Sequence, residues 1–78
     1  MKEPLRAYIT SELIRDPNYP LQDDEALITG GLVDSFSLVQ VALFIEENFG
    51  VHLEDFELTA DNMDTLNAIV AFVESKRT

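Results

Sequence analysis

Apolar residues recur at intervals of three and four in three separate segments, and this spacing constrains the fold more than any other feature of the chain. Such intervals place apolar side chains on one face of an α-helix, and no segment alternates convincingly in the manner of a half-buried strand. The spacing predicts helices over about residues 3–15, 35–48 and 65–76. Pro4 suits the first turn of the first helix, and Gly50 ends the second. We therefore expect an all-α fold.

The two outer helices each carry one apolar face. In the first helix this face is formed by Leu5, Tyr8, Ile9 and Leu13. In the last helix it is formed by Leu66, Ile69, Val70 and Val73. Asp64 or Thr65 is expected to cap the last helix, because a side-chain oxygen at that position accepts from the free N–H groups of the first turn. Lys76 and Arg77 complement the dipole at its other end.

A long loop is predicted between the first two helices, over residues 16–34. It contains an acidic run at 23–25 and a glycine pair at 30–31, which disfavour regular structure. A loop of this length is unusual in a compact domain and is often functional. Some of its apolar residues should pack against the helices: Leu21, Leu27, Ile28, Leu32 and Val33. A short helix within residues 53–58 or 60–63 would complete a bundle of three main helices plus one short helix.

The chain length limits the classes of function. The 78 residues predict a single domain over residues 1–78, with a modest core and little room for a deep catalytic cleft. There is no cysteine, which removes disulfides and thiolate chemistry. No apolar run approaches the ~18–20 residues of a membrane span, and the start of the chain lacks a signal-peptide core. We expect a cytoplasmic monomer.

Charge is distributed very unevenly along the chain. Fifteen acidic residues face five basic ones, for a net charge of −10. No Lys or Arg lies between Asp16 and Ser75, whereas every acidic residue except Glu3 and Glu12 lies there. Such a surface repels phosphate backbones, which excludes nucleic acid as a partner, and it attracts proteins with basic patches. Alternatively, the acidic residues only keep a small protein soluble.

The second predicted helix has two apolar faces. At about 100° per residue, one arc holds Leu38, Val41, Ala42, Ile45 and Phe49, and we expect this arc to pack on the other helices. A second arc holds Phe36, Val39 and Leu43, and around it lie Gln40, Glu46 and Glu47. Either the loop or the short helix buries this second arc, or it is an exposed apolar strip rimmed by carboxylates. The exposed form is typical of a partner-binding surface.

Ser35 begins this helix directly after Asp34. Either side chain can cap the helix by accepting from a first-turn N–H group. A serine at this place is also exposed, held in position and close to the positive end of the helix dipole, which favours a phosphate on its hydroxyl. A catalytic serine is disfavoured, because His52 is the only histidine and no G-x-S-x-G elbow surrounds Ser35. The acidic runs do not follow EF-hand spacing, so we expect no dedicated metal site.

The run Gly31-Leu32-Val33-Asp34-Ser35-Phe36, at the start of an amphipathic helix that ends Phe44-Ile45-Glu46-Glu47-Asn48-Phe49-Gly50-Val51, resembles the carrier-protein family. This family comprises acyl carrier proteins and the related peptidyl, aminoacyl and D-alanyl carriers, and the resemblance spans nearly the whole chain. It implies that Ser35 is the attachment point for 4′-phosphopantetheine, transferred from coenzyme A by a phosphopantetheinyl transferase. Asp34 would help to present the serine. The partner-binding face would consist of Phe36, Val39, Leu43, Glu46 and Glu47.

The resemblance also implies a non-catalytic protein that carries acyl or aminoacyl groups as thioesters for fatty-acid, polyketide or nonribosomal-peptide-type biosynthesis. Its partners would be a loading ligase and synthases or transferases with basic patches. Val33, Phe36 and Ser37 depart from the pattern of many fatty-acid carriers and look more like stand-alone carriers of specialised pathways, including aminoacyl and D-alanyl types. With a hydrophobic cargo, the core could open to shelter the chain. Two rivals are an unmodified interaction module, which docks through the second arc, and a small hydrolase.

Overall fold

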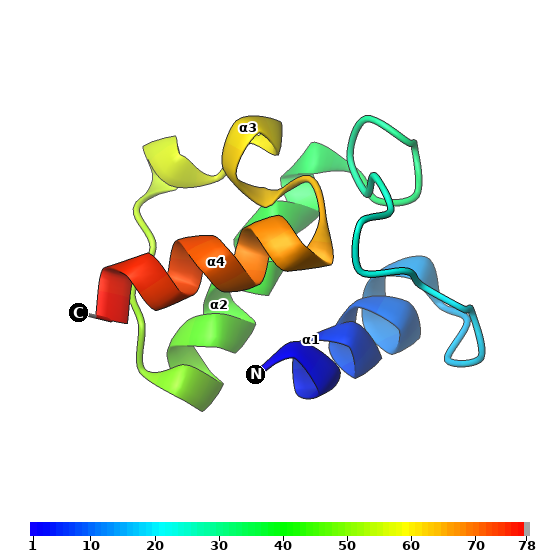
Figure 1. Ribbon diagram of the computed structural model, residues 1–78, viewed down its shortest axis with the longest axis horizontal. Helices are drawn as coiled ribbons and strands as arrows, with labels where there is room; N and C mark the ends of the chain where they lie inside the picture. The colour runs from blue at the N-terminus through cyan, green and yellow to red at the C-terminus, as the bar shows by residue number, and fades with distance from the viewer. Residues whose placement is uncertain (78) are drawn as a thin grey trace.

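The computed structural model describes residues 1–77, and these residues form helices, turns and loops with no β-strand among them (Figure 1). The long helical segments are α1 (Lys2–Tyr8), extended by the π-helix η1 (Ile9–Ile14), then α2 (Leu38–Phe49) and α4 (Leu66–Arg77). The short ones are η2 (Ser35–Ser37), η3 (Asp55–Glu57) and α3 (Ala60–Met63). The predicted all-α bundle is confirmed, and both positions considered for a short helix are helical.

The first helix ends as predicted but changes type along its length. Arg15 adopts a left-handed conformation with φ of 65°, and the N–H of Asp16 donates to the carbonyl of Thr10 at 2.8 Å, which closes the end. The π-helical second half was not predicted. Here the buried Thr10 hydroxyl donates to the carbonyls of Arg6 at 3.0 Å and Ala7 at 3.2 Å. This bonding competes with the backbone ladder of a regular α-helix.

The core lies where α4 crosses α2, with α1 beside both (Figure 1). The first arc of α2 faces this core as predicted: Leu38, Val41 and Ile45 are each at most 1% exposed. The largest fully buried side chains elsewhere are Leu5, Ile9, Leu27, Met63, Leu66, Ile69 and Val73. Burying one such side chain contributes about 1.5–3 kcal/mol, so these residues supply most of the drive to fold.

Rings stack at the edge of this core. The rings of Tyr8 and Phe44 lie 4.3 Å apart, and Phe49 meets Phe44 edge-on at 5.9 Å. Tyr8 is only half-buried, as are Leu13 and Val70, so the predicted apolar faces of the outer helices reach the surface at their margins. The stack ties the start of the chain to α2.

The long loop is held onto the helices rather than free in solvent. Leu21, Leu27 and Val33 are buried, and Ile28 and Leu32 pack against the core, which confirms the prediction for this segment. The Arg6 guanidinium donates to the carbonyl of Leu21 and the carboxylate of Asp23, and the N–H of Asn67 donates to the carbonyl of Asp23 at 3.0 Å. The loop is therefore fixed to both α1 and α4.

The sequence left open whether Asp64 or Thr65 caps α4, and the structure shows that Thr65 does. The Thr65 hydroxyl oxygen caps α4 by accepting from the N–H of Ala68 at 3.0 Å. The Asp64 carboxylate instead accepts from the N–H of Ile28 at 2.8 Å, the N–H of Thr29 at 3.0 Å and the Thr29 hydroxyl at 2.7 Å. Asp64 therefore holds the long loop against the junction between α3 and α4.

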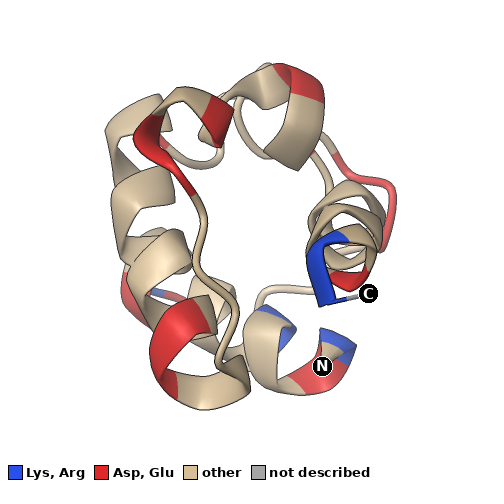
Figure 2. Cartoon of the chain, turned by 90° about the vertical axis from the view of Figure 1, so that its left-hand side faces the viewer, with Lys and Arg blue, Asp and Glu red and all other residues tan. Residues whose placement is uncertain are grey.

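The charges follow the sequence pattern in space. Figure 2 shows most of the Lys and Arg positions near the two chain ends, whereas Asp and Glu are spread over the fold and also occur beside both chain ends. Within residues 1–77, no helix combines the length and apolar character needed to cross a membrane.

Candidate functional site

Ser35 stands at the start of η2, which runs directly into α2. Asp34 precedes it in an extended conformation, and its Oδ1 accepts from the N–H of Phe36 at 3.0 Å while its carbonyl accepts from Ser37 at 2.9 Å. Asp34 is therefore the cap of this helical segment, and such a cap contributes about 0.5–2 kcal/mol. Of the two residues that the sequence offered for this role, the structure selects Asp34.

The Ser35 hydroxyl remains available because its neighbour serves as the cap. Ser35 is exposed, and within residues 1–77 its hydroxyl takes part in no hydrogen bond. It lies at the positive end of the dipole of a helical segment that continues to Phe49. These features fit a group attached through a phosphate: the oxygen is accessible, the backbone is fixed and the helix end favours negative charge.

The segment before the serine is rigidly placed. Val33 is 7% exposed, and its N–H donates to the carbonyl of Leu27 at 2.9 Å. A Cβ at Gly30 would lie 2.2 Å from the carbonyl oxygen of Ala26, so only glycine fits there. Gly31 turns the chain with φ of 79°. The buried Val33, two residues before Ser35, therefore anchors the loop that presents the serine.

His52 is too far from Ser35 to act as its general base. Ser35 precedes the N-terminus of α2, whereas His52 follows its C-terminus, and a helix of 12 residues spans about 18 Å. The His52 ring is also engaged by Glu46 and Glu54. The geometry therefore excludes His52 as the general base that the serine hydrolase alternative needs.

The second arc of α2 is exposed, and this decides the alternative that the sequence left open. Phe36 is 83% exposed, Leu43 55% and Val39 51%. We call these three residues the docking strip, after the partner-binding role that the resemblance implies for them. Neither the long loop nor the short helices cover it, so the interpretation that it is buried is wrong. Exposed polar residues flank it, as the helical wheel predicts: Gln40, Glu46 and Glu47.

Sequence reasoning missed Phe56. This residue lies in η3 and is 80% exposed, between Asp55 and Glu57. The signal that could have identified it is an aromatic residue surrounded by acidic ones, in a segment too short to form a buried helix face. The end of η3 is tied to α4, since the Lys76 ammonium contacts the Glu57 carboxylate at 2.6 Å.

Glu46, at the edge of the docking strip, has a partner within the chain. Its Oε1 lies 2.6 Å from Nδ1 of His52, and Nε2 of His52 lies 3.3 Å from Oε1 of Glu54. The hydrogen bond with Glu46, then the charge of Glu54, raise the pKa of His52 above its usual 6.5. Glu47 makes no side-chain hydrogen bond within residues 1–77. Of the two carboxylates predicted to flank the strip, Glu46 is therefore paired within the described residues and Glu47 is not.

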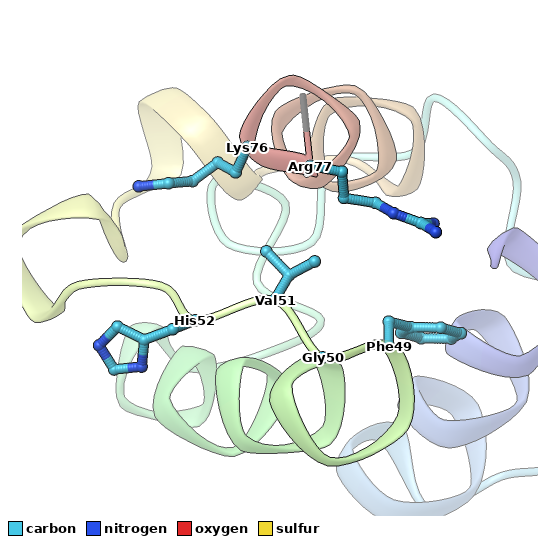
Figure 3. Close-up of a pocket in the computed structure, with 6 residues that line it drawn as sticks. All are labelled: Phe49, Gly50, Val51, His52, Lys76 and Arg77. Atoms are coloured by element: carbon cyan, nitrogen blue, oxygen red, sulfur yellow. The ribbon is translucent and has the colours of Figure 1, made fainter.

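A hollow of about 310 Å³ lies at the far end of α2 from Ser35 (Figure 3). It is lined by Phe49, Gly50, Val51, His52, Lys76 and Arg77. The His52 and Lys76 side chains extend to one side of it and the Phe49 and Arg77 side chains to the other (Figure 3). Neither Ser35 nor the docking strip lines this hollow, so it is separate from the predicted site.

Comparison with known proteins gives two informative relatives. No protein-family model matches the chain. The chain is similar to a D-alanyl carrier protein of Lactobacillus acidophilus (strain ATCC 700396 / NCK56 / N2 / NCFM) and to one of Lactobacillus helveticus (strain DPC 4571). Each is 41% identical over 54 residues, which span 69% of this chain and 68% of the relative.

Proposed function

This chain belongs to the acyl carrier protein family, and we propose that it is a non-catalytic, cytoplasmic carrier with a 4′-phosphopantetheine arm on Ser35. The arm supplies a terminal thiol that holds an acyl or aminoacyl group as a thioester. The protein delivers this group to enzymes that act in trans. Tethering raises the local concentration of the group at each active site in turn.

The observation that carries this proposal is the free hydroxyl of Ser35 beside a capping Asp34. In the loading step, the Ser35 oxygen forms a bond to a phosphorus of coenzyme A, and adenosine 3′,5′-bisphosphate leaves. The hydroxyl proton passes to a base of the phosphopantetheinyl transferase, since His52 lies at the far end of α2. Asp34 holds the backbone of Ser35 in place through its bond to Phe36. The helix N-terminus favours the resulting phosphodiester.

We propose an aminoacyl cargo, with D-alanine as the first candidate. Both relatives are named D-alanyl carrier proteins, and the Leu-Val-Asp-Ser-Phe form at residues 32–36 supports the same class. A ligase that activates the amino acid would then be the loading partner.

The docking strip supports binding to enzymes with an apolar patch bordered by basic residues. Its three apolar side chains are exposed, and no Lys or Arg occurs between residues 16 and 75 to oppose such a partner. Long-range attraction between opposite charges speeds the encounter, and the apolar contact stabilises the complex once formed.

The test is mass measurement after incubation with coenzyme A, Mg²⁺ and a broad-specificity phosphopantetheinyl transferase. We expect the wild type and Ser37→Ala to gain one phosphopantetheine unit and Ser35→Ala to gain none. Ser37→Ala is the matched control, because it removes a hydroxyl from the same turn. The loaded protein is then offered D-alanine, ATP and a candidate ligase, and a thioester is detected by a further mass gain.

Absence of any gain, with a folded helical spectrum and an active control carrier, would refute the carrier proposal. The protein would then be an unmodified interaction module that uses the docking strip alone. A gain that persists in Ser35→Ala would place the arm on another side chain and refute the assignment of Ser35.

A further inference from the structure

His52 connects two segments through two carboxylates. Nδ1 faces Glu46 of α2 at 2.6 Å, and Nε2 faces Glu54 of the segment that enters η3 at 3.3 Å. Ionised carboxylates only accept hydrogen bonds, so both ring nitrogens must carry a proton for both contacts to be hydrogen bonds. The two carboxylates therefore favour the imidazolium form, in which both contacts are charge-assisted.

The other charged groups near His52 are largely matched among themselves. From η3, Glu57 is paired with Lys76 of α4 at 2.6 Å, and the charge of His52 contributes to lowering its pKa. Arg77 of α4 shares the hollow with His52 and lies 3.9 Å from Glu74. The groups in direct contact with the ring are thus the carboxylates of Glu46 and Glu54, and both stabilise its protonated form.

Glu46 continues the docking strip by one helical turn. Leu43 and Glu46 are three residues apart in α2, a spacing that places side chains next to each other on one face. The side chains of Glu46 and His52 are 50% and 67% exposed, so a partner seated on Leu43 can reach both. A basic side chain of such a partner would meet a carboxylate that already holds a cation.

We propose that a partner's Lys or Arg replaces His52 as the counter-ion of Glu46, so that docking on α2 releases a proton from His52. The partner's cation takes up Glu46, whose hydrogen bond is the largest cause of the raised pKa of His52, and leaves the ring with Glu54 alone. The two cations also repel each other, and removal of water by the partner strengthens that repulsion. The proton can leave, whereas a guanidinium stays charged. This inference rests on the proposed function, because it takes the docking strip as the surface that partner enzymes contact.

The sign of the resulting pH dependence follows from linkage. The partner binds best to the form in which His52 is neutral, so affinity increases as pH rises through the pKa of His52 in the free protein, which lies above 6.5. A difference of half a unit to one unit between free and docked pKa values changes affinity by about threefold to tenfold. The change is confined to the interval between those two values.

The experiment measures binding of the apo protein to a phosphopantetheinyl transferase without coenzyme A, by titration calorimetry between pH 5.5 and 8.5. The affinity of His52→Gln changes with pH only through titration of other groups, including those of the transferase. Beyond that change, we expect the affinity of the wild type to increase by about threefold to tenfold from low to high pH. In two buffers of different ionisation enthalpy near pH 7, the wild type should release a fraction of a proton more than His52→Gln. Because His52 is exposed, its replacement leaves the core intact.

Two glutamate variants separate this exchange from general charge effects. Glu46→Gln should remove the extra pH dependence, and an NMR titration of the free variant should show a lower pKa for His52. Glu47→Gln is the matched control, because it removes a neighbouring carboxylate that makes no contact with His52. It should bind more weakly at every pH and keep the pH dependence of the wild type.

Equal pH dependence in the wild type and His52→Gln would overturn the inference, as would an unchanged His52 pKa in Glu46→Gln. Failure of the transferase to bind the apo protein would also count against it. The mass gain at Ser35 is measured separately, so a carrier that is modified without proton release refutes this inference and leaves the proposed function standing. A protein that is never modified refutes the proposed function.

Discussion

Asp64 is expected to stabilise the fold by holding the long loop to the start of α4. Its carboxylate accepts three hydrogen bonds from residues 28 and 29, and its carbonyl accepts a fourth from Leu27 at 2.6 Å. Replacing Asp64 with alanine leaves two backbone N–H groups and one hydroxyl without their acceptor. The backbone carbonyl bond remains, so the variant tests the side chain alone.

The size of the effect follows from these contacts. A hydrogen bond to a charged group contributes about 1.5–3 kcal/mol when buried, but Thr29 is exposed and water can replace the lost acceptor there. We therefore expect Asp64→Ala to lower the free energy of unfolding by about 2 kcal/mol in total. For a chain of this size, such a change lowers the melting temperature by roughly 10 °C. Asp64→Asn keeps one acceptor oxygen and should lose about half as much.

The assay is urea unfolding followed by circular dichroism, with Asp61→Ala as the matched control. Asp61 is an exposed aspartate of α3, and its side chain makes no hydrogen bond within residues 1–77. The bonds from Thr29 lower the pKa of Asp64 below its usual 3.8. Its stabilisation is therefore complete above about pH 5 and is lost as pH falls through the lowered value. Equal urea midpoints for Asp64→Ala and Asp61→Ala at pH 7 would refute the stabilising role of the Asp64 carboxylate.

Three further predictions test the packing, the strip and the histidine. Gly30→Ala should lower the free energy of unfolding by about 1–3 kcal/mol, measured by urea unfolding, because its Cβ meets the Ala26 carbonyl oxygen at 2.2 Å. Leu43→Ala should change stability by less than about 0.5 kcal/mol and weaken transferase binding in calorimetry, whereas Ile45→Ala on the opposite face should cost about 2–5 kcal/mol. The wild type should have a higher urea midpoint than His52→Gln at pH 6, and this excess should vanish as pH rises through the raised pKa of His52. A difference that does not change with pH would contradict the pairing of His52 with Glu46 and Glu54.

Local pattern was sufficient for the helices and for their faces. The apolar spacing of residues 36–49 identifies both arcs of the continuous helical segment formed by η2 and α2, since a helical period places each side chain without reference to the rest of the molecule. The cap at the start of η2 was narrowed to two adjacent residues for the same reason. The sequence did not predict the π-helical form of η1, in which the Thr10 hydroxyl donates back to the carbonyls of Arg6 and Ala7 in α1.

Exposure and long-range pairing were decided by tertiary structure. The docking strip is exposed because no other segment within residues 1–77 covers that side of α2, and a helical wheel cannot predict this. Asp64 holds Thr29 across 35 positions of sequence, and His52 joins Glu46 to Glu54 around the end of α2. The sequence by itself determined which residues share a helix face and that Ser35 begins a helix. Only the folded chain determined which carboxylates already have partners, because a hydrogen bond depends on distances that the path of the loop sets.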